Sequence, residues 1–273
     1  CALKVPDDHF AVVANAFAIR EVNVSLRGGA SPTLLFSDSM LRVSRERGWL
    51  KAGEHILDFA FHFSGSVPEP SHKFYSGRRM WTAYRLLAPS LGIPANYSKL
   101  NVDSAFPTSA PPDTLVGLSD VRRVMRDRYQ GTRYSLQHGL AAGPYGSPDR
   151  WRGGAGEAAV SGGWERAISI SRTRVGYILQ ARSWMPDAVG GVAWFAPHAA
   201  HTSCFTPFAV GMATLPVSYT SSTASVANLS TAFWAHRAVF NRVQAMFDLM
   251  IKDVEVLQAQ LEGASETLQA RLD

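Results

Sequence analysis

The first residue of the chain, Cys1, carries two groups that can cooperate in chemistry. Its thiol is a potential nucleophile, and an α-amine has a pKa of about 8, so it can act as the general base for its own thiol. A thiolate formed in this way attacks amides and gives an acyl-enzyme. The alternative is that Cys1 is an ordinary strand residue, which stands first only because of where the chain starts.

A second group of reactive residue types comprises His198, His201 and Cys204. Their spacing could suggest a metal site, but two imidazoles and one thiol in a Pro/Ala-rich loop lack a fourth ligand and a helical register. We therefore expect structural or surface roles for them. We also expect neither a metal nor another cofactor in this protein.

Composition limits the classes of partner. The 273 residues are 46% hydrophobic and 18% charged, which is ordinary for a globular protein. No apolar run approaches the ~20 residues of a membrane-spanning helix, so we expect no membrane span. The formal charge of +5 comes mainly from clustered arginines. The modules of nucleic-acid binders are missing, however, so we expect no nucleic acid partner.

The cellular location is only weakly constrained. Two cysteines imply no disulfide framework. Asn-x-Ser sequons, which are acceptors for glycosylation in a secretory compartment, favour that route slightly. They begin at Asn23, Asn96 and Asn228.

The elements that must position these residues change in character along the chain. The first half predicts short strands at 2–5, 10–15 and 18–24, and helices at 38–47, 55–63, 77–88 and from Ser119. The second half predicts antiparallel strands at 168–170, 175–179, 189–195, 205–210 and 216–220. One long amphipathic helix follows at 232–262, and the five glycines within 152–163 indicate a flexible loop. We expect a single α+β domain over residues 1–273.

The glycines and prolines from Tyr129 to Arg150 rule out a long regular element, so this stretch is either a binding loop or a plain connector. Its sequence is informative. Arg-Asp-Arg-Tyr-Gln-Gly-Thr, followed by Gly-Pro-Tyr-Gly-Ser-Pro-Asp-Arg-Trp, resembles the signature of the dipeptidase A family. These are N-terminal-nucleophile cysteine dipeptidases, related to penicillin V acylases, bile salt hydrolases and secernins.

Further blocks agree with this resemblance in order and spacing. They are Val-Pro-Asp-Asp at 5–8 with Ala14-Asn15, the helical segment 74–90, and the run from Gln180-Ala181-Arg182 to Pro207-Phe208. The resemblance implies an αββα four-layer sandwich.

The resemblance also implies roles for three residues of this chain. Asn15 would present its side-chain amide to the developing oxyanion. Arg79 would orient the amine–thiolate pair or grip a substrate carboxylate, and Arg78 is the alternative, as a substrate-binding residue. The opposing interpretations are a strand-end asparagine that satisfies a turn and arginines that are simply solvated on a helix.

This chain departs from the family at its start. The residues after Cys1 resemble an interior strand rather than the Thr- and Gly-rich opening that follows the family's nucleophile. We therefore expect the C-terminal two-thirds of a dipeptidase, present as a fragment or processed subunit, with an N-terminal companion segment and a dipeptide substrate. The alternative is a non-catalytic scaffold or assembly subunit, and the sequence also leaves room for a homo-oligomer.

Overall fold

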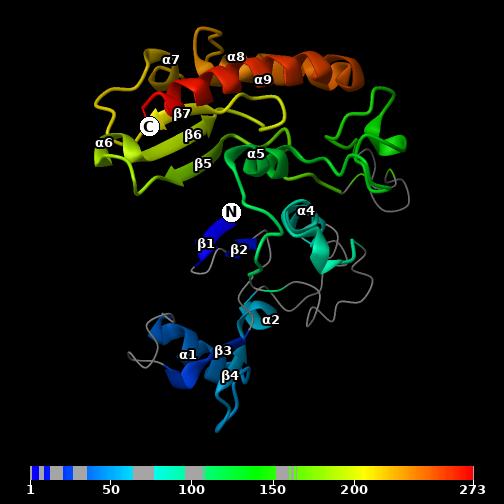
Figure 1. The fold of residues 1–273 in the computed structure, drawn as a ribbon. Coiled ribbons are helices and arrows are strands. Elements are labelled where there is room, and N and C mark those ends of the chain that lie inside the picture. The colour runs from blue at the N-terminus through cyan, green and yellow to red at the C-terminus, as the bar shows by residue number, and fades with distance from the viewer. Residues whose placement is uncertain are drawn as a thin grey trace. The chain divides into compact units, whose positions relative to one another are not determined.

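The computed structural model is a mixture of helices and short antiparallel strands, which confirms the predicted α+β class (Figure 1). Its internal contacts cluster into two compact units, Cys1–Val116 and Gly117–Asp273. The single domain over residues 1–273 stays a prediction. The structure describes residues 2–5, 9–12, 21–26, 36–63, 77–95, 107, 109–151, 160, 163 and 165–272.

The first unit begins with a β-hairpin and a helix that packs on it. β1 (Ala2–Val5) pairs antiparallel with β2 (His9–Val12). Phe10 of β2 is buried, and its ring centroid lies 5.2 Å from that of Tyr84 in α4 (Gly77–Leu87). Phe10 also exchanges both backbone hydrogen bonds with Ala110. These contacts tie β2 to the helix that carries Arg78 and Arg79.

The helix α4 matches the segment predicted at 77–88 and ends for the expected reason. Pro89, which starts the 3₁₀ turn η3 (Pro89–Leu91), cannot continue the hydrogen-bond ladder and disfavours helical dihedrals at Ala88. The indole of Trp81 donates to the carbonyl of Ile93 over 3.0 Å, so the turn folds back on the helix.

A second core in this unit surrounds another strand pair. β3 (Glu21–Asn23) is followed by η2 (Val24–Leu26) and pairs antiparallel with β4 (Ile56–Asp58). The helix predicted at 55–63 is therefore only half realised, as α2 (Phe59–Phe63), because Leu57 pairs with Val22. α1 (Asp38–Glu46) forms as predicted and ends before Gly48, whose φ is +68°. The buried residues are Val22, Val24, Met40, Leu41, Leu50 and Leu57.

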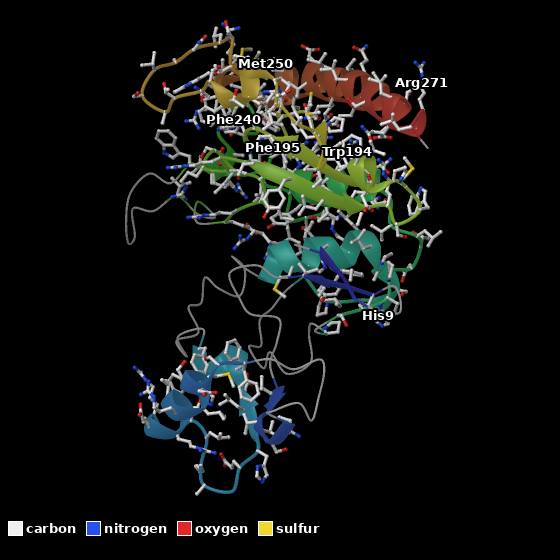
Figure 2. The ribbon with its side chains drawn as sticks, turned by 90° about the vertical axis from the view of Figure 1, so that its left-hand side faces the viewer. His9, Trp194, Phe195, Phe240, Met250 and Arg271 are labelled. Atoms are coloured by element: carbon white, nitrogen blue, oxygen red, sulfur yellow. The ribbon has the colours of Figure 1, made fainter. Side chains whose placement is uncertain are left out.

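The second unit is organised around an antiparallel sheet in the order β5–β6–β7. The strands are β5 (Gly176–Ala181), β6 (Gly191–Ala196) and β7 (Thr206–Ala209), with α6 (Asp187–Gly190) in the first connection. Trp194 and Phe195 follow one another in β6, so their side chains point to opposite faces (Figure 2). Trp194 is 2% exposed and belongs to the core of this unit. The strands predicted at 175–179, 189–195 and 205–210 are confirmed.

Two of the predicted strands are wrong. The segment 216–220 forms the helical turn α7 (Val217–Thr220), which places the Tyr219 ring against Phe208 at 4.9 Å. The segment 168–170 leads into a turn, in which the amide of Thr173 donates to the carbonyl of Ile170 over 2.9 Å. The alternation of apolar residues predicted strands because it does not record the ring contact of Tyr219 or the hydrogen bond of Thr173.

Helices cover one face of this sheet (Figure 1), and a single carboxylate joins them to it. Arg126 of α5 (Leu118–Arg126) donates to both oxygens of Glu262, at 3.0 and 2.5 Å. Glu262 lies in α9 (Phe247–Ala270), is 5% exposed and also accepts the backbone amide of Phe205 at 2.7 Å. The guanidinium of Arg122 lies 3.7 Å from this carboxylate and 4.8 Å from the Trp194 ring.

The helix predicted as one element at 232–262 is two elements. α8 (Ala232–Ala245) stops and α9 begins at Met246, whose dihedrals (φ −142°, ψ 57°) are not helical. The break has a tertiary cause, because the amide of Asp248 donates to the carbonyl of Tyr145, beside η4 (Leu140–Ala142), over 3.0 Å. α9 also continues beyond Gly263, the predicted end, and its last turns pair with α5. The loop predicted at 152–163 lies largely outside the described residues.

None of the helices in the described part of the chain is long and apolar enough to cross a membrane.

Candidate functional site

Two of the predicted catalytic residues, Cys1 and Asn15, lie outside the residues that the structure describes, so their roles stay predictions. The strands beside them in sequence are described. Ala2 pairs with Val12, so the chain enters β1 and leaves β2 at the same end of the hairpin.

Arg78 and Arg79 occupy the first turn of α4. The amide groups of a first turn create a partial positive charge, which disfavours a cation by about 0.3–1 kcal/mol. Arg78 is nevertheless 6% exposed, and Arg79 is half-buried. Burial of Arg78 at the positive end of a helix argues against the interpretation that it is simply solvated. A guanidinium can bind a carboxylate through two parallel hydrogen bonds, and substrate binding by Arg78 stays a prediction.

Tyr84 holds this part of the unit together. Its hydroxyl donates to the carbonyl of Pro107 over 2.7 Å, and burial raises its pKa to about 12. The phenol is therefore neutral at neutral pH and serves as an anchor rather than as an acid or base. Its ring fixes α4 against β2, which relates the position of the arginine pair to that of the hairpin.

In the second unit, His198 and His201 are buried structural residues. Nδ1 of His201 lies 2.8 Å from the hydroxyl of Ser169, and Nε2 of His198 accepts from Arg237 over 2.9 Å. Burial lowers the pKa of His198 to about 4 and that of His201 to about 3, and nearby arginines add to both effects. Both rings are therefore neutral near pH 7. The residues that the structure describes include no group of three or more His, Cys, Asp and Glu arranged to hold a metal.

Cys204, the other cysteine, has an unreactive environment. It is half-buried, and burial, followed by the charge of Glu262, raises the pKa of its thiol to about 11. Because the thiolate is the reactive form, Cys204 is a weak nucleophile near pH 7.

The stretch Tyr129–Arg150 is held by many structural contacts. Tyr129 is completely buried, has a left-handed φ of 61° and donates its hydroxyl to the carbonyl of Arg166 over 2.6 Å. The neighbouring Arg128 pairs with Glu255 of α9 at 3.2 Å. These contacts favour the connector interpretation, since the loop braces the start of α9.

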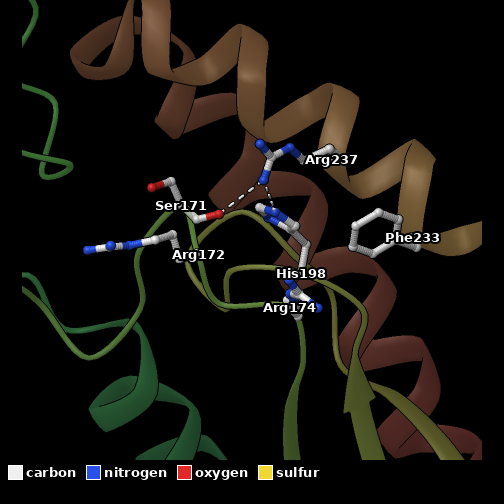
Figure 3. A pocket seen from close by; sticks show the side chains of 6 residues that line it. All are labelled: Ser171, Arg172, Arg174, His198, Phe233 and Arg237. Carbon is white, nitrogen blue, oxygen red and sulfur yellow. Dashed lines mark hydrogen bonds between the residues drawn. The ribbon is translucent and has the colours of Figure 1, made fainter. Parts of the chain in front are cut away.

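Of the residues that line a pocket in the second unit, sequence analysis singled out only His198 (Figure 3). The hollow has a volume of about 420 Å³ and is lined by Ser171, Arg172, Arg174, His198, Phe233 and Arg237. The available signal for this pocket in the sequence was the pair Arg172 and Arg174, which stands just before β5. Arg237 is remote in the sequence, so only the fold associates it with them.

Comparison with known proteins identifies related chains. The model of peptidase family C69 matches residues 1–260. A probable dipeptidase of Latilactobacillus sakei is 26% identical over 277 residues, which cover 98% of this chain and 50% of the relative. A probable dipeptidase of Salmonella dublin is 27% identical over 77% of this chain and 42% of the relative. Dipeptidase A of Lactobacillus helveticus is 24% identical over 86% of this chain and 43% of the relative. The chain therefore spans about half the length of the curated relatives that it matches.

Proposed function

The chain belongs to peptidase family C69, and on that premise we propose that it is part of a cysteine-type dipeptidase, present as a fragment or processed subunit. The observation that carries the proposal is similarity along nearly the whole chain to proteins named dipeptidases. A thiolate attacks the carbonyl carbon of the dipeptide amide, and the C-terminal amino acid leaves with a proton. Water then hydrolyses the thioester, which releases the N-terminal amino acid and restores the thiol.

Within this chain, Cys1 is the better candidate for the nucleophile. It is one of two cysteines, and the other, Cys204, has a raised thiol pKa and a half-buried position. In this proposal the side-chain amide of Asn15 donates to the oxyanion, while Arg79 or Arg78 binds a substrate carboxylate.

The proposed architecture is the αββα sandwich, completed by a companion N-terminal segment. The sheet β5–β7 supports it, because helices cover the face that carries Trp194. On the other face Tyr177 is 55% exposed and Leu179 is 71% exposed. Apolar side chains on an open sheet face are what a second sheet would cover.

The test is hydrolysis of a panel of dipeptides by the purified protein, with and without thiol alkylation. We expect alkylation to reduce turnover by about 100-fold or more, since the nucleophile is lost. Cys1→Ala should have the same effect, while Cys204→Ala, the matched control, should retain activity within about twofold. If alkylation abolishes activity while Cys1→Ala stays fully active, the dipeptidase proposal stands and the nucleophile belongs to the companion segment. Activity that survives alkylation would overturn the cysteine mechanism. No hydrolysis of any dipeptide by the chain together with its companion segment would overturn the dipeptidase and favour the scaffold alternative.

A further inference from the structure

The pocket of Figure 3 is built from three segments of the second unit that are far apart in sequence. Ser171 and Arg172 lie in the turn closed by Ile170 and Thr173, and Arg174 follows just before β5. His198 comes after β6, and Phe233 and Arg237 lie one turn apart on α8. The tertiary structure thus brings three arginines to one hollow.

Arg237 is held in place at the wall of this hollow. One of its terminal nitrogens donates to the carbonyl of Ser171 over 3.0 Å and to Nε2 of His198 over 2.9 Å, as the dashed lines in Figure 3 mark. Arginine is always a donor, so Nε2 of His198 is the acceptor and the ring is neutral. Both partners are uncharged acceptors, so neither of them neutralises the guanidinium.

Among the residues that the structure describes, no acidic side chain balances the positive charge of the pocket. None of the six lining residues is acidic. Within the described ranges, neither Arg172, Arg174 nor Arg237 forms an ion pair with a carboxylate, in contrast to Arg122, Arg126 and Arg128, which all do. Arg172 and Arg174 are exposed, and the Arg172 side chain extends outward from the turn (Figure 3), so both are available at the rim.

The pocket also has an apolar side. The ring of Phe233 lies 5.9 Å from that of His198 in an edge-to-face arrangement. A volume of about 420 Å³ is within the range of small-molecule sites. The arginine forks match planar or tetrahedral oxyanions, and the aromatic wall matches an apolar group attached to one.

We propose that this pocket binds a small oxyanion, a carboxylate or a phosphate, that carries an apolar group. Arg237 holds the anionic oxygens, Arg172 and Arg174 add positive charge at the rim, and Phe233 contacts the apolar group. The inference does not depend on the dipeptidase proposal, since it uses other residues and is tested by binding rather than by hydrolysis.

The experiment is isothermal titration calorimetry of the protein with phenylacetate, acetate, inorganic phosphate and the neutral analogue phenylacetamide. We expect phenylacetate to bind several-fold more tightly than acetate, and phenylacetamide not to bind measurably. Stronger binding of phosphate than of phenylacetate would identify a phosphate ligand, and the reverse order a carboxylate.

Two variants test the arginines. Arg237→Gln keeps a donor for Ser171 but removes the charge, and we expect about tenfold weaker binding or more. Arg172→Glu removes no contact that the structure shows, so it tests the charge without threatening the fold, and we expect several-fold weaker binding. Arg242→Gln, an exposed arginine on the same helix, is the control and should bind as the unchanged protein does. Absence of binding by every anion would overturn the proposal. Unchanged binding in both Arg172→Glu and Arg237→Gln, with both variants folded, would also overturn it.

Discussion

The buried imidazoles of His198 and His201 predict that the protein loses stability between pH 7 and pH 5. Their pKa values in the folded chain are about 4 and about 3, against 6.5 for a free imidazole. Below pH 6.5 the unfolded chain therefore binds protons that the folded chain does not. The free energy of unfolding is highest above this pH and falls as the pH drops towards 4.

The magnitude follows from the same shifts. Each pH unit below the unfolded pKa lowers the free energy of unfolding by about 1.4 kcal/mol per histidine, as long as the folded ring stays neutral. At pH 5, which is about 1.5 units below the unfolded value, each ring accounts for about 2 kcal/mol and the pair for about 4 kcal/mol. This is a large share of the ~5–15 kcal/mol that stabilises a typical domain.

The assay is urea unfolding at pH 7 and pH 5, followed by near-ultraviolet circular dichroism. Other groups also titrate, so the informative quantity is the difference between variant and unchanged protein. His201→Asn offers an amide where Nδ1 faces Ser169, and His198→Gln offers one where Nε2 faces Arg237. We expect each variant to reduce the acid-induced loss by about 2 kcal/mol. His138→Gln, on the surface, controls for the removal of an exposed histidine.

A result that would refute this reasoning is an equal acid-induced loss in the unchanged protein and in both buried-site variants. The two imidazoles would then gain no protons on unfolding, and burial would not keep them neutral.

Two further predictions concern packing in the second unit. Glu262→Gln removes the buried charge that Arg126 binds through both carboxylate oxygens, and it should lower the free energy of unfolding by about 3–5 kcal/mol. Glu266→Gln, at a half-exposed carboxylate that pairs with Arg122, should cost less, because Arg122 keeps Glu262 within 3.7 Å. Similar melting temperatures for the two variants would contradict the central role of Glu262. Gly146→Ala adds a methyl group that overlaps the carboxylate of Asp248 at a φ of +63°, while Gly131→Ala meets open space at a φ of +73°. We expect both to cost about 1–2 kcal/mol from backbone strain, because the exposed Asp248 side chain can turn away from the added methyl group. A clearly larger loss for Gly146→Ala in thermal unfolding would contradict this and show that Asp248 is held in place.

The family could be identified from the sequence, because its motifs are local, whereas the roles of Cys1, Asn15 and Arg79 stay predictions. Val-Pro-Asp-Asp and Ala14-Asn15 carry the family resemblance without any knowledge of the fold, and the family match over residues 1–260 agrees with it. The sequence did not indicate that Arg78 is buried, since neighbouring arginines in a helix have the same pattern whether they face water or protein. That distinction needed the packing of α4 on β2.

The sequence by itself determined the elements whose signals are local: the strands β5 and β6, and the stop of α4 at Pro89. Only the tertiary structure decided the bounds of elements that depend on residues distant in the sequence. The carbonyl of Tyr145 divides one periodic helix at Met246, and the amphipathic pattern cannot record a partner a hundred residues away. The pocket around Arg237 has the same origin, because its arginines acquire a shared function only when a turn, a strand end and a helix meet. Periodicity encodes which face of an element is buried, whereas the identity of the groups that meet there is a property of the fold.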